Sequence, residues 1–285
     1  MDKRIFRLAF PNIISNITVP LLGMIDIAIA GHLGSVIYIG AIALASNVFN
    51  MIYWNFGFLR MSTSGFTAQA YGARNFGEAM NVLLRSLIVA IGFGLLILLL
   101  QVPIEKIAIN FIKSGPETIE NVKYYFRICV WSAPMVLGVY AFNGWFIGMQ
   151  NAKIPMVIAI INNVLNIVLS FIFVFGFDMK IKGIALGTML SQIITFAITL
   201  AFWFRYYGRL NKYINISTIF DIKALKLFSK VNSDVCVRTF MITLVTTFFT
   251  FASSGLGDTI LAVNALLMQF FALFSYQSLW TPINW

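Results

Sequence analysis

Long runs of apolar residues, separated by short polar links, recur from one end of the chain to the other. Each run is long enough for a helix that crosses a bilayer, which needs about 20 predominantly apolar residues. The runs exceed the strands of a membrane barrel, which alternate apolar and polar residues over roughly ten positions. The pattern therefore predicts an all-α integral membrane protein. Its eight predicted spans cover approximately residues 8–31, 36–59, 82–102, 124–147, 154–177, 184–206, 234–254 and 260–280.

The composition supports this class. Hydrophobic residues make up 60% of the chain and charged residues 11%, against about 45–50% and about 25% in soluble domains. The net charge of +10 raises the question of nucleic acid, but lysine and arginine stand at the ends of apolar runs, where they orient helices. We therefore expect membrane lipids, and no nucleic acid, as partners. Cys129 and Cys236 show neither CxxC nor metal-ligand spacing, so we expect no metal or redox site.

The basic residues favour one set of segment ends. Because cytoplasmic loops are enriched in lysine and arginine, the richer set is predicted to be cytoplasmic, together with the N terminus. The richer set is Lys3, Arg4, Arg7, Arg74, Arg85, Lys153, Arg205, Arg209, Lys212, Lys223, Lys226 and Lys230, and the other is Lys106, Lys113, Lys123, Lys180 and Lys182.

The longest polar break, Arg205–Ser233, suggests that the chain has two parts. Its amphipathic stretch Asp221–Phe228 is typical of a short helix at the membrane surface. Leu33–Ile37 and Leu256–Ile260 also resemble each other, and internal repeats recur in secondary transporters. We expect a six-helix N-terminal lobe in residues 1–212, followed by a cytoplasmic linker helix and a partial two-helix C-terminal lobe in residues 213–285.

Asp26 is a lone carboxylate near the end of the first apolar run. A charge at bilayer depth costs roughly 2.5–3.5 kcal/mol on insertion scales, and such residues usually face a protein interior or a water-filled path. Gly23 and Ala30, one turn on either side, would let another helix or water approach closely. Because removal from water favours the protonated acid, Asp26 is our candidate for proton coupling. The alternative is a structural carboxylate satisfied by neighbouring hydroxyls or amides.

Polar side chains also recur at helical spacing in the fifth and sixth runs. One set repeats every four residues, and a second set, rich in threonine, repeats every three or four. Each set either lines a cavity or only holds helices together, at about 0.6 kcal/mol per contact. The first set is Asn162, Asn166 and Ser170, and the second is Thr188, Ser191, Gln192, Thr195 and Thr199. Our candidate cavity residues are Asn162, Asn166, Ser170, Thr188 and Gln192.

Two prolines, Pro11 and Pro20, fall in the run that contains Asp26. Proline removes a backbone donor and bends a helix, and the freed carbonyls line a cavity or act as a hinge. The single histidine, His32, lies six residues beyond Asp26, which is not a same-face spacing. A pH-sensing role and an interfacial packing role both remain open for it.

Several of these stretches resemble one family. Met24–Gly34 is similar to the Val-Asp-Thr-x-x-x-Gly-x-Leu-Gly signature of the MATE (multidrug and toxic compound extrusion) transporters, and Phe58–Ala73 closely resembles the second segment of their DinF-type branch. The likeness extends over about residues 4–276. Its other motifs are Asn143–Gly144, Gly148, Gln150, Pro155, Asn166–Ser170, Phe175–Gly176, Gly183–Thr188, Asp234–Arg238 and Ala262–Leu266.

The resemblance implies a proton- or sodium-coupled antiporter that exports amphipathic, often cationic, compounds across the inner (plasma) membrane of a bacterium. It implies twelve helices in two lobes around a cavity that opens alternately to each side. Asp26 then matches the coupling acid, Pro11 the bend in its helix, and Asn166 and Thr188 polar cavity residues. Many relatives have a second acid where this chain has Ser170, so we expect H⁺ rather than Na⁺ as the coupling ion, and no other cofactor.

Members of the family are longer than this chain, and the likeness ends at Gln277. We therefore expect a truncated or frameshifted product. Three readings stay open: a drug/proton antiporter, a non-transporting fragment, and a lipid-linked saccharide flippase of the same superfamily. The flippases commonly line their cavity with arginine or lysine, and no cationic cluster is evident in the predicted spans. No nucleophile–base pair, metal cluster or phosphate loop is evident either, so we do not predict an enzyme.

Overall fold

The computed structural model describes residues 26, 29, 31, 32, 36–112 and 115–214, and ten single positions between 226 and 245. The chain divides into two compact units, Met1–Asn232 and Ser233–Trp285. The predicted bends at Pro11 and Pro20 lie outside the described residues, as does nearly all of the predicted linker helix and of the last two spans. The lobe boundary predicted after residue 212 stays a prediction.

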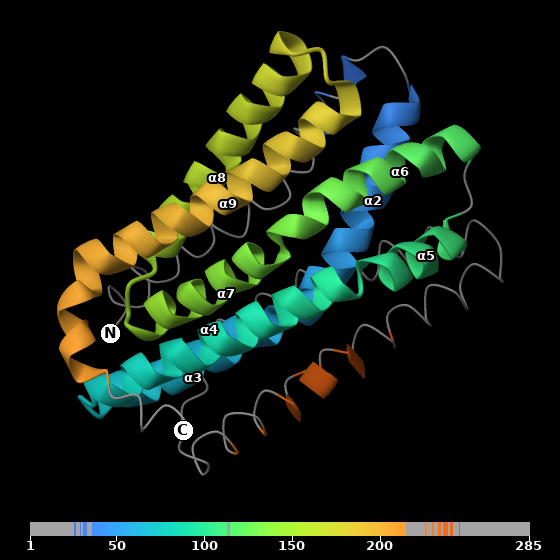
Figure 1. The fold of residues 1–285 in the computed structure, drawn as a ribbon. Helices are drawn as coiled ribbons and strands as arrows, with labels where there is room; N and C mark the ends of the chain where they lie inside the picture. Colours follow the sequence, from blue (N-terminus) through green and yellow to red (C-terminus); the bar gives the residue numbers. More distant parts are fainter. Residues whose placement is uncertain are drawn as a thin grey trace, which may run out of the picture. The chain divides into compact units, whose positions relative to one another are not determined.

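Every regular element among the described residues is a helix, which confirms the all-α prediction (Figure 1). In chain order they are α2 (Val36–Asn55), α3 (Gly57–Gly72), α4 (Phe76–Leu99), α5 (Gln101–Phe111), α6 (Pro116–Cys129), η1 (Val130–Ser132), α7 (Ala133–Gly148), α8 (Lys153–Phe171), the π-helical turn η2 (Ile172–Gly176), α9 (Lys180–Tyr207) and η3 (Gly208–Tyr213).

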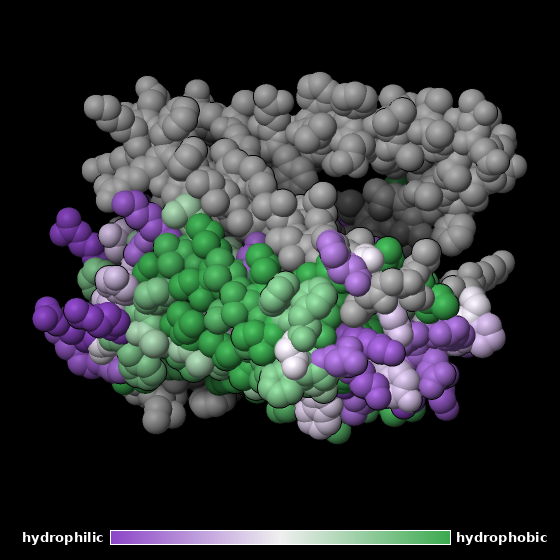
Figure 2. Space-filling view, turned by 90° about the horizontal axis from the view of Figure 1, so that it is seen from above, coloured by the Kyte–Doolittle hydropathy of each residue, from purple (hydrophilic) through white to green (hydrophobic). Residues whose placement is uncertain are grey.

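Five helical stretches in this part of the chain are long and apolar enough to cross a membrane. They correspond to the second to sixth predicted spans and confirm the membrane class. Figure 2 shows one face of the molecule, on which apolar side chains gather in the middle and hydrophilic ones toward the two ends. A bilayer around the helices favours this distribution. The five stretches are Ile37–Gly72, Phe76–Leu99, Pro116–Gly148, Lys153–Gly176 and Lys180–Tyr213.

The second predicted span ended too early. The chain turns at Phe56, directly after α2, and continues as α3 to Gly72 rather than ending at residue 59. The hydropathy pattern fails there because Arg60 and a run of hydroxyl residues follow. The helix tolerates these residues because some of them are buried and hydrogen-bonded: Ser62 Oγ donates to the Phe58 carbonyl at 2.9 Å.

Two helices begin earlier than their apolar runs. In α4 the first turn is capped by Asn75, whose side-chain oxygen accepts a hydrogen bond from the Glu78 N–H at 3.0 Å, and the acidic Glu78 suits the helix dipole. In α6 the first residue is Pro116, which loses no intrahelical hydrogen bond at that position. Both starts depend on local capping chemistry, which hydropathy does not detect.

The centre of the first unit lies around α7, which packs against α3, α4 and α9. Its aromatic residues Phe142, Trp145 and Phe146 are fully buried. Two glycines allow close contact with α3: a Cβ on Gly144 would lie 2.5 Å from the Arg60 carbonyl oxygen, and one on Gly148 would lie 2.5 Å from Thr67 Cβ. The helix α3 is therefore fixed in depth and rotation against α7.

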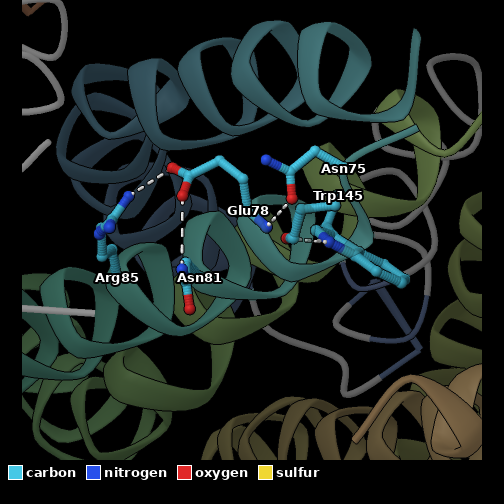
Figure 3. A network of polar contacts seen from close by, with 6 residues as sticks. Asn75, Glu78, Asn81, Arg85 and Trp145 are labelled. Atoms are coloured by element: carbon cyan, nitrogen blue, oxygen red, sulfur yellow. Dashed lines mark hydrogen bonds and ion pairs between the residues drawn. The ribbon is translucent and has the colours of Figure 1, made fainter. Parts of the chain in front are cut away.

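An ion pair with an amide partner occupies the start of α4 (Figure 3). The Arg85 guanidinium, whose side chain is 3% exposed, donates to Glu78 Oε1 at 2.7 Å. Asn81 donates to Glu78 Oε2 at 3.3 Å, and nearby Trp145 Nε1 donates to the Ala79 carbonyl at 2.8 Å. The prediction that Arg85 marks the end of a span is wrong, because it lies well inside α4 and is neutralised there.

Candidate functional site

Asp26 is buried, with 3% of its surface exposed. Thr188 of α9 donates a hydrogen bond to Asp26 Oδ2 at 3.5 Å, and Asn166 of α8 donates to the Thr188 hydroxyl at 2.9 Å. These three residues are far apart in sequence, and the packing of α8 against α9 brings two of them together beside the third. The candidate coupling acid and two of the candidate cavity residues thus form one contact chain.

The hold on Asp26 is weak. The Thr188 hydroxyl has a single proton, and the carbonyl of Ile184, one turn earlier, competes for it at 3.0 Å. A contact of 3.5 Å is at the long limit for a hydrogen bond. Within the described residues, Asp26 Oδ1 has no hydrogen-bond partner. From the described residues, the buried carboxyl group thus receives one long hydrogen bond, which is less than the set of donors that would fix it in the ionised form.

Two further side-chain oxygens near Asp26 and Thr188 also have no hydrogen-bond partner in the described part of the structure: Asn166 Oδ1 and Ser170 Oγ. Ser170 packs against Gly187, where an added Cβ would lie within contact of its hydroxyl. Buried polar atoms of this kind usually bind water or an ion. One carboxylate and two neutral oxygens suit a proton or a water molecule better than a hard metal ion, which takes six or more oxygens.

The sequence reasoning missed two buried neighbours on α6. Tyr125 and Cys129 are both buried, and Tyr125 interacts with the Thr188 side chain beside Asp26. Cys129 Sγ also lies 3.5 Å from the Ala185 carbonyl on α9. The four-residue spacing of Tyr125 and Cys129 places them on one helix face, and this spacing is the signal that could have identified them.

The remaining candidate cavity residues belong to separate contacts. Thr195 donates to Asn162 Oδ1 at 3.1 Å, and Ser132 of η1 donates to the Gln192 side-chain oxygen. Thr199 donates to its own helix, at the Thr195 carbonyl. The polar residues of α8 and α9 thus separate into one group at Asp26 and others that join helices to one another.

His32 and the possible metal ligands were also considered as neighbours of Asp26. His32 is exposed, and its backbone N–H donates to the Ile29 carbonyl at 3.2 Å. Within the described residues, no group of three or more histidine, cysteine, aspartate or glutamate side chains is arranged to hold a metal ion. The candidate site therefore consists of one acid with hydroxyl and amide neighbours.

The sequence is similar to that of known membrane transporters. Residues 11–172 match the MatE family model. The chain is 35% identical to DNA damage-inducible protein F of Escherichia coli K12 over 280 residues, which are 96% of this chain and 60% of that protein. It is 24% identical to the multidrug export protein MepA of Staphylococcus aureus over 191 residues, 67% of this chain and 42% of MepA. The chain thus spans about 60% of the length of its DinF relative.

Solved structures share the fold. A MATE protein crystallised in a bent conformation superimposes with a TM-score of 0.82 at 24% identity, covering 95% of this chain and 61% of that one. A MOP superfamily transporter from Pyrococcus furiosus gives 0.80 at 23% identity, covering 95% and 60%. The predicted MATE-like helical bundle is confirmed. By the match of its sequence to the family model and by its fold, this chain belongs to the MATE family of multi-pass membrane proteins.

Proposed function

We propose that this chain supplies the proton-coupled half of a secondary active exporter in the inner (plasma) membrane of a bacterium. It would export small amphipathic molecules, organic cations among them, by alternating access. Asp26 is the coupling carboxylate: it binds a proton from one side of the membrane and releases it to the other as substrate moves in the opposite direction. The name of MepA, a multidrug export protein, supports the export of drugs.

The observation behind this proposal is the incomplete satisfaction of Asp26. Its carboxyl group is buried, receives one long hydrogen bond from Thr188, and leaves Oδ1 without a partner in the described residues. A purely structural carboxylate at membrane depth would be expected to accept several short hydrogen bonds. A group that exchanges protons needs both forms to be accessible, and neither form is locked here.

The proton is favoured over Na⁺ by the ligands available. Ser170 stands where many relatives have a second acid, so the site holds one carboxylate beside the neutral oxygens of Asn166 and Thr188. A proton needs one acceptor, whereas a hard cation needs a shell of oxygens. We accordingly propose H⁺ as the coupling ion.

The test is uptake of a fluorescent organic cation into inverted proteoliposomes under an imposed pH gradient. Asp26→Asn keeps the shape of the side chain but removes the exchangeable proton, so gradient-driven uptake should fall to the level of empty vesicles. The matched control is Asp178→Asn. Asp178 is exposed between α8 and α9 with a φ of 52°, a conformation that asparagine adopts readily, so this variant should transport normally.

Gradient-driven uptake that survives in Asp26→Asn would rule out the coupling role. Uptake driven by a Na⁺ gradient at constant pH, and lost in the same variant, would replace H⁺ by Na⁺ and leave the export function intact. Uptake that is absent from the unmodified 285-residue chain as well would identify it as the non-transporting fragment.

A further inference from the structure

The exposed face of α2 and α3 combines polar and apolar side chains, whereas the exposed residues in the central turns of α4 and α8 are apolar. Within the described residues its exposed polar side chains are Asn47, Asn50, Arg60 and Gln69, and half-buried Ser64 continues the series. Arg60 and Ser64 are about one helical turn apart, so they lie on the same side of α3. Charged and amide groups at membrane depth face protein or a water-filled cavity, not lipid. This face is therefore expected to border other protein or a water-filled cavity rather than lipid.

The contacts of its neighbours Phe58 and Thr63 place Arg60 level with the middle of α4. The Thr63 hydroxyl lies 2.7 Å from the Ser86 hydroxyl, and the ring of Phe58 lies 6.4 Å from that of Phe93. Ser86 and Phe93 flank the centre of α4, which runs from Phe76 to Leu99. From Arg60 to the end of α3 at Gly72 is about 18 Å at 1.5 Å per residue. That distance is beyond the reach of an arginine side chain extending to the membrane surface.

Arg60 also differs from two other arginines of the described helices. Arg85 is paired with Glu78 and Arg127 with Glu105, each at 2.7 Å. Arg60 forms no ion pair in the described part of the chain. Its backbone is held against α7 by close packing. The exposed guanidinium that this backbone positions can bind an anion.

The residues around Arg60 suit an amphipathic ligand. Met51, Trp54 and Met61 are between 51% and 63% exposed on the same two helices. Methionine adapts to ligands of different shape, and tryptophan offers a broad apolar surface. A compound with an apolar body and one acidic group would place the body on these side chains and the acid on Arg60.

We propose that Arg60 is a substrate-binding residue for amphipathic anions, and that the substrates of this transporter therefore include compounds with a carboxylate or sulfonate group. The proposal rests on the export function proposed above and extends it, since Asp26 serves the proton and Arg60 the acidic group of the substrate. The planar guanidinium can donate two parallel hydrogen bonds to a carboxylate. A neutral or cationic compound gains nothing from Arg60.

The test is equilibrium binding to the 285-residue chain in nanodiscs of phosphatidylcholine, with empty nanodiscs subtracted. Two tritiated probes share a pyrenylbutyl body: one has a carboxylate and the other a trimethylammonium group. Arg60→Gln should weaken carboxylate binding by about tenfold or more, the loss of one charge-assisted contact, and should leave ammonium binding unchanged or improved. Arg60→Lys keeps the charge but loses the planar pair of donors, so it should retain only part of the affinity for the carboxylate.

The matched control is Arg205→Gln, which removes an exposed arginine from the last turn of α9 and should not change binding of either probe. Equal affinity of the carboxylate for Arg60→Gln and for the unmodified chain would overturn the proposal. So would loss of carboxylate binding when phosphatidylglycerol replaces phosphatidylcholine, because Arg60 would then hold a lipid phosphate. Binding that persists in phosphatidylglycerol supports a substrate site.

This experiment is independent of the transport assay. If Arg60-dependent binding holds while proton-driven uptake fails, the coupling mechanism is wrong and the anion site stands. If uptake depends on Asp26 while Arg60→Gln binds the carboxylate normally, the proposed anion site is wrong and the proposed export function is retained.

Discussion

Two kinds of exposed surface occur on these helices at the same depth. On α4, α8 and α9 the exposed residues in the central turns of the membrane-spanning stretches are apolar, as at Leu95, Val164 and Ile194. On α2 and α3 the exposed residues include asparagine, glutamine and Arg60. Because hydrocarbon cannot hydrogen-bond with polar groups, only the first kind can border lipid. The contrast separates the side of the bundle that faces the bilayer from the side that faces other protein or water.

The charged groups of the bundle differ in burial in the same way. Asp26, Asn166 and Thr188 are buried between helices, whereas Arg60 is exposed on α3. A buried acid with few donors suits exchange of a small ion, and an exposed cation on a polar face suits contact with a larger molecule. In the proposals above the two charges thus have different tasks. The three predictions below test the two kinds of surface, from the largest expected effect to the smallest.

The largest effect is expected where a charge is moved to the apolar face. Val164 lies at the middle of the α8 span and is 51% exposed, so Val164→Arg should destabilise the inserted protein by roughly 2.5–3.5 kcal/mol. Gly65→Arg is the matched change on α3, where an added Cβ meets nothing within 4 Å, and should change stability by less than about 1 kcal/mol. Unfolding in mixed micelles titrated with SDS measures both. Equal losses would contradict the division into two surfaces.

A smaller effect is expected from loosening the contact that orients the polar face. Gly144→Ala would place a Cβ 2.5 Å from the Arg60 carbonyl oxygen, and forcing these backbones apart should cost about 1–3 kcal/mol. Gly92→Ala on the exposed side of α4 meets nothing within 4 Å and should be neutral or slightly stabilising. The midpoint of thermal unfolding compares the two variants. If they behave alike, α3 is not held by α7 in the way the structure shows.

The smallest effect is expected inside the bundle. Thr188→Val removes the hydroxyl that links Asn166 to Asp26 and should destabilise the protein by about 1 kcal/mol. Thr199→Val removes a hydroxyl that donates to a carbonyl of its own helix, and should cost less than about 0.6 kcal/mol, the average for polar contacts between membrane helices. The same SDS titration resolves the difference. If Thr199→Val destabilises the protein more than Thr188→Val does, the hydrogen bonds around Asp26 contribute no more stability than the hydroxyl contacts within a helix.

The class of protein, the positions of most spans and the location of Asp26 in the protein interior could be predicted from the sequence, because each depends on local content. Apolar length is sufficient to predict a membrane helix, since the backbone in lipid can satisfy its hydrogen bonds only within the helix or in a closed barrel. Asp26 stood out for a related reason, as a charge among apolar neighbours. The helix ends were less predictable: Asn75 caps α4 and Pro116 starts α6 ahead of their apolar runs.

Contacts between distant residues came only from the packing. Nothing in the spacing of Asp26, Tyr125 and Thr188 indicates that they meet, because they lie on separate helices and periodicity describes one helix at a time. Likewise, hydropathy treated Arg60 as the polar end of a span, and only the continuation of α3 to Gly72 and its contacts with α4 place it at mid-membrane. Sequence pattern establishes that a polar residue lies in a membrane helix, whereas the neighbouring helices decide whether its side chain is buried, paired or open to a ligand.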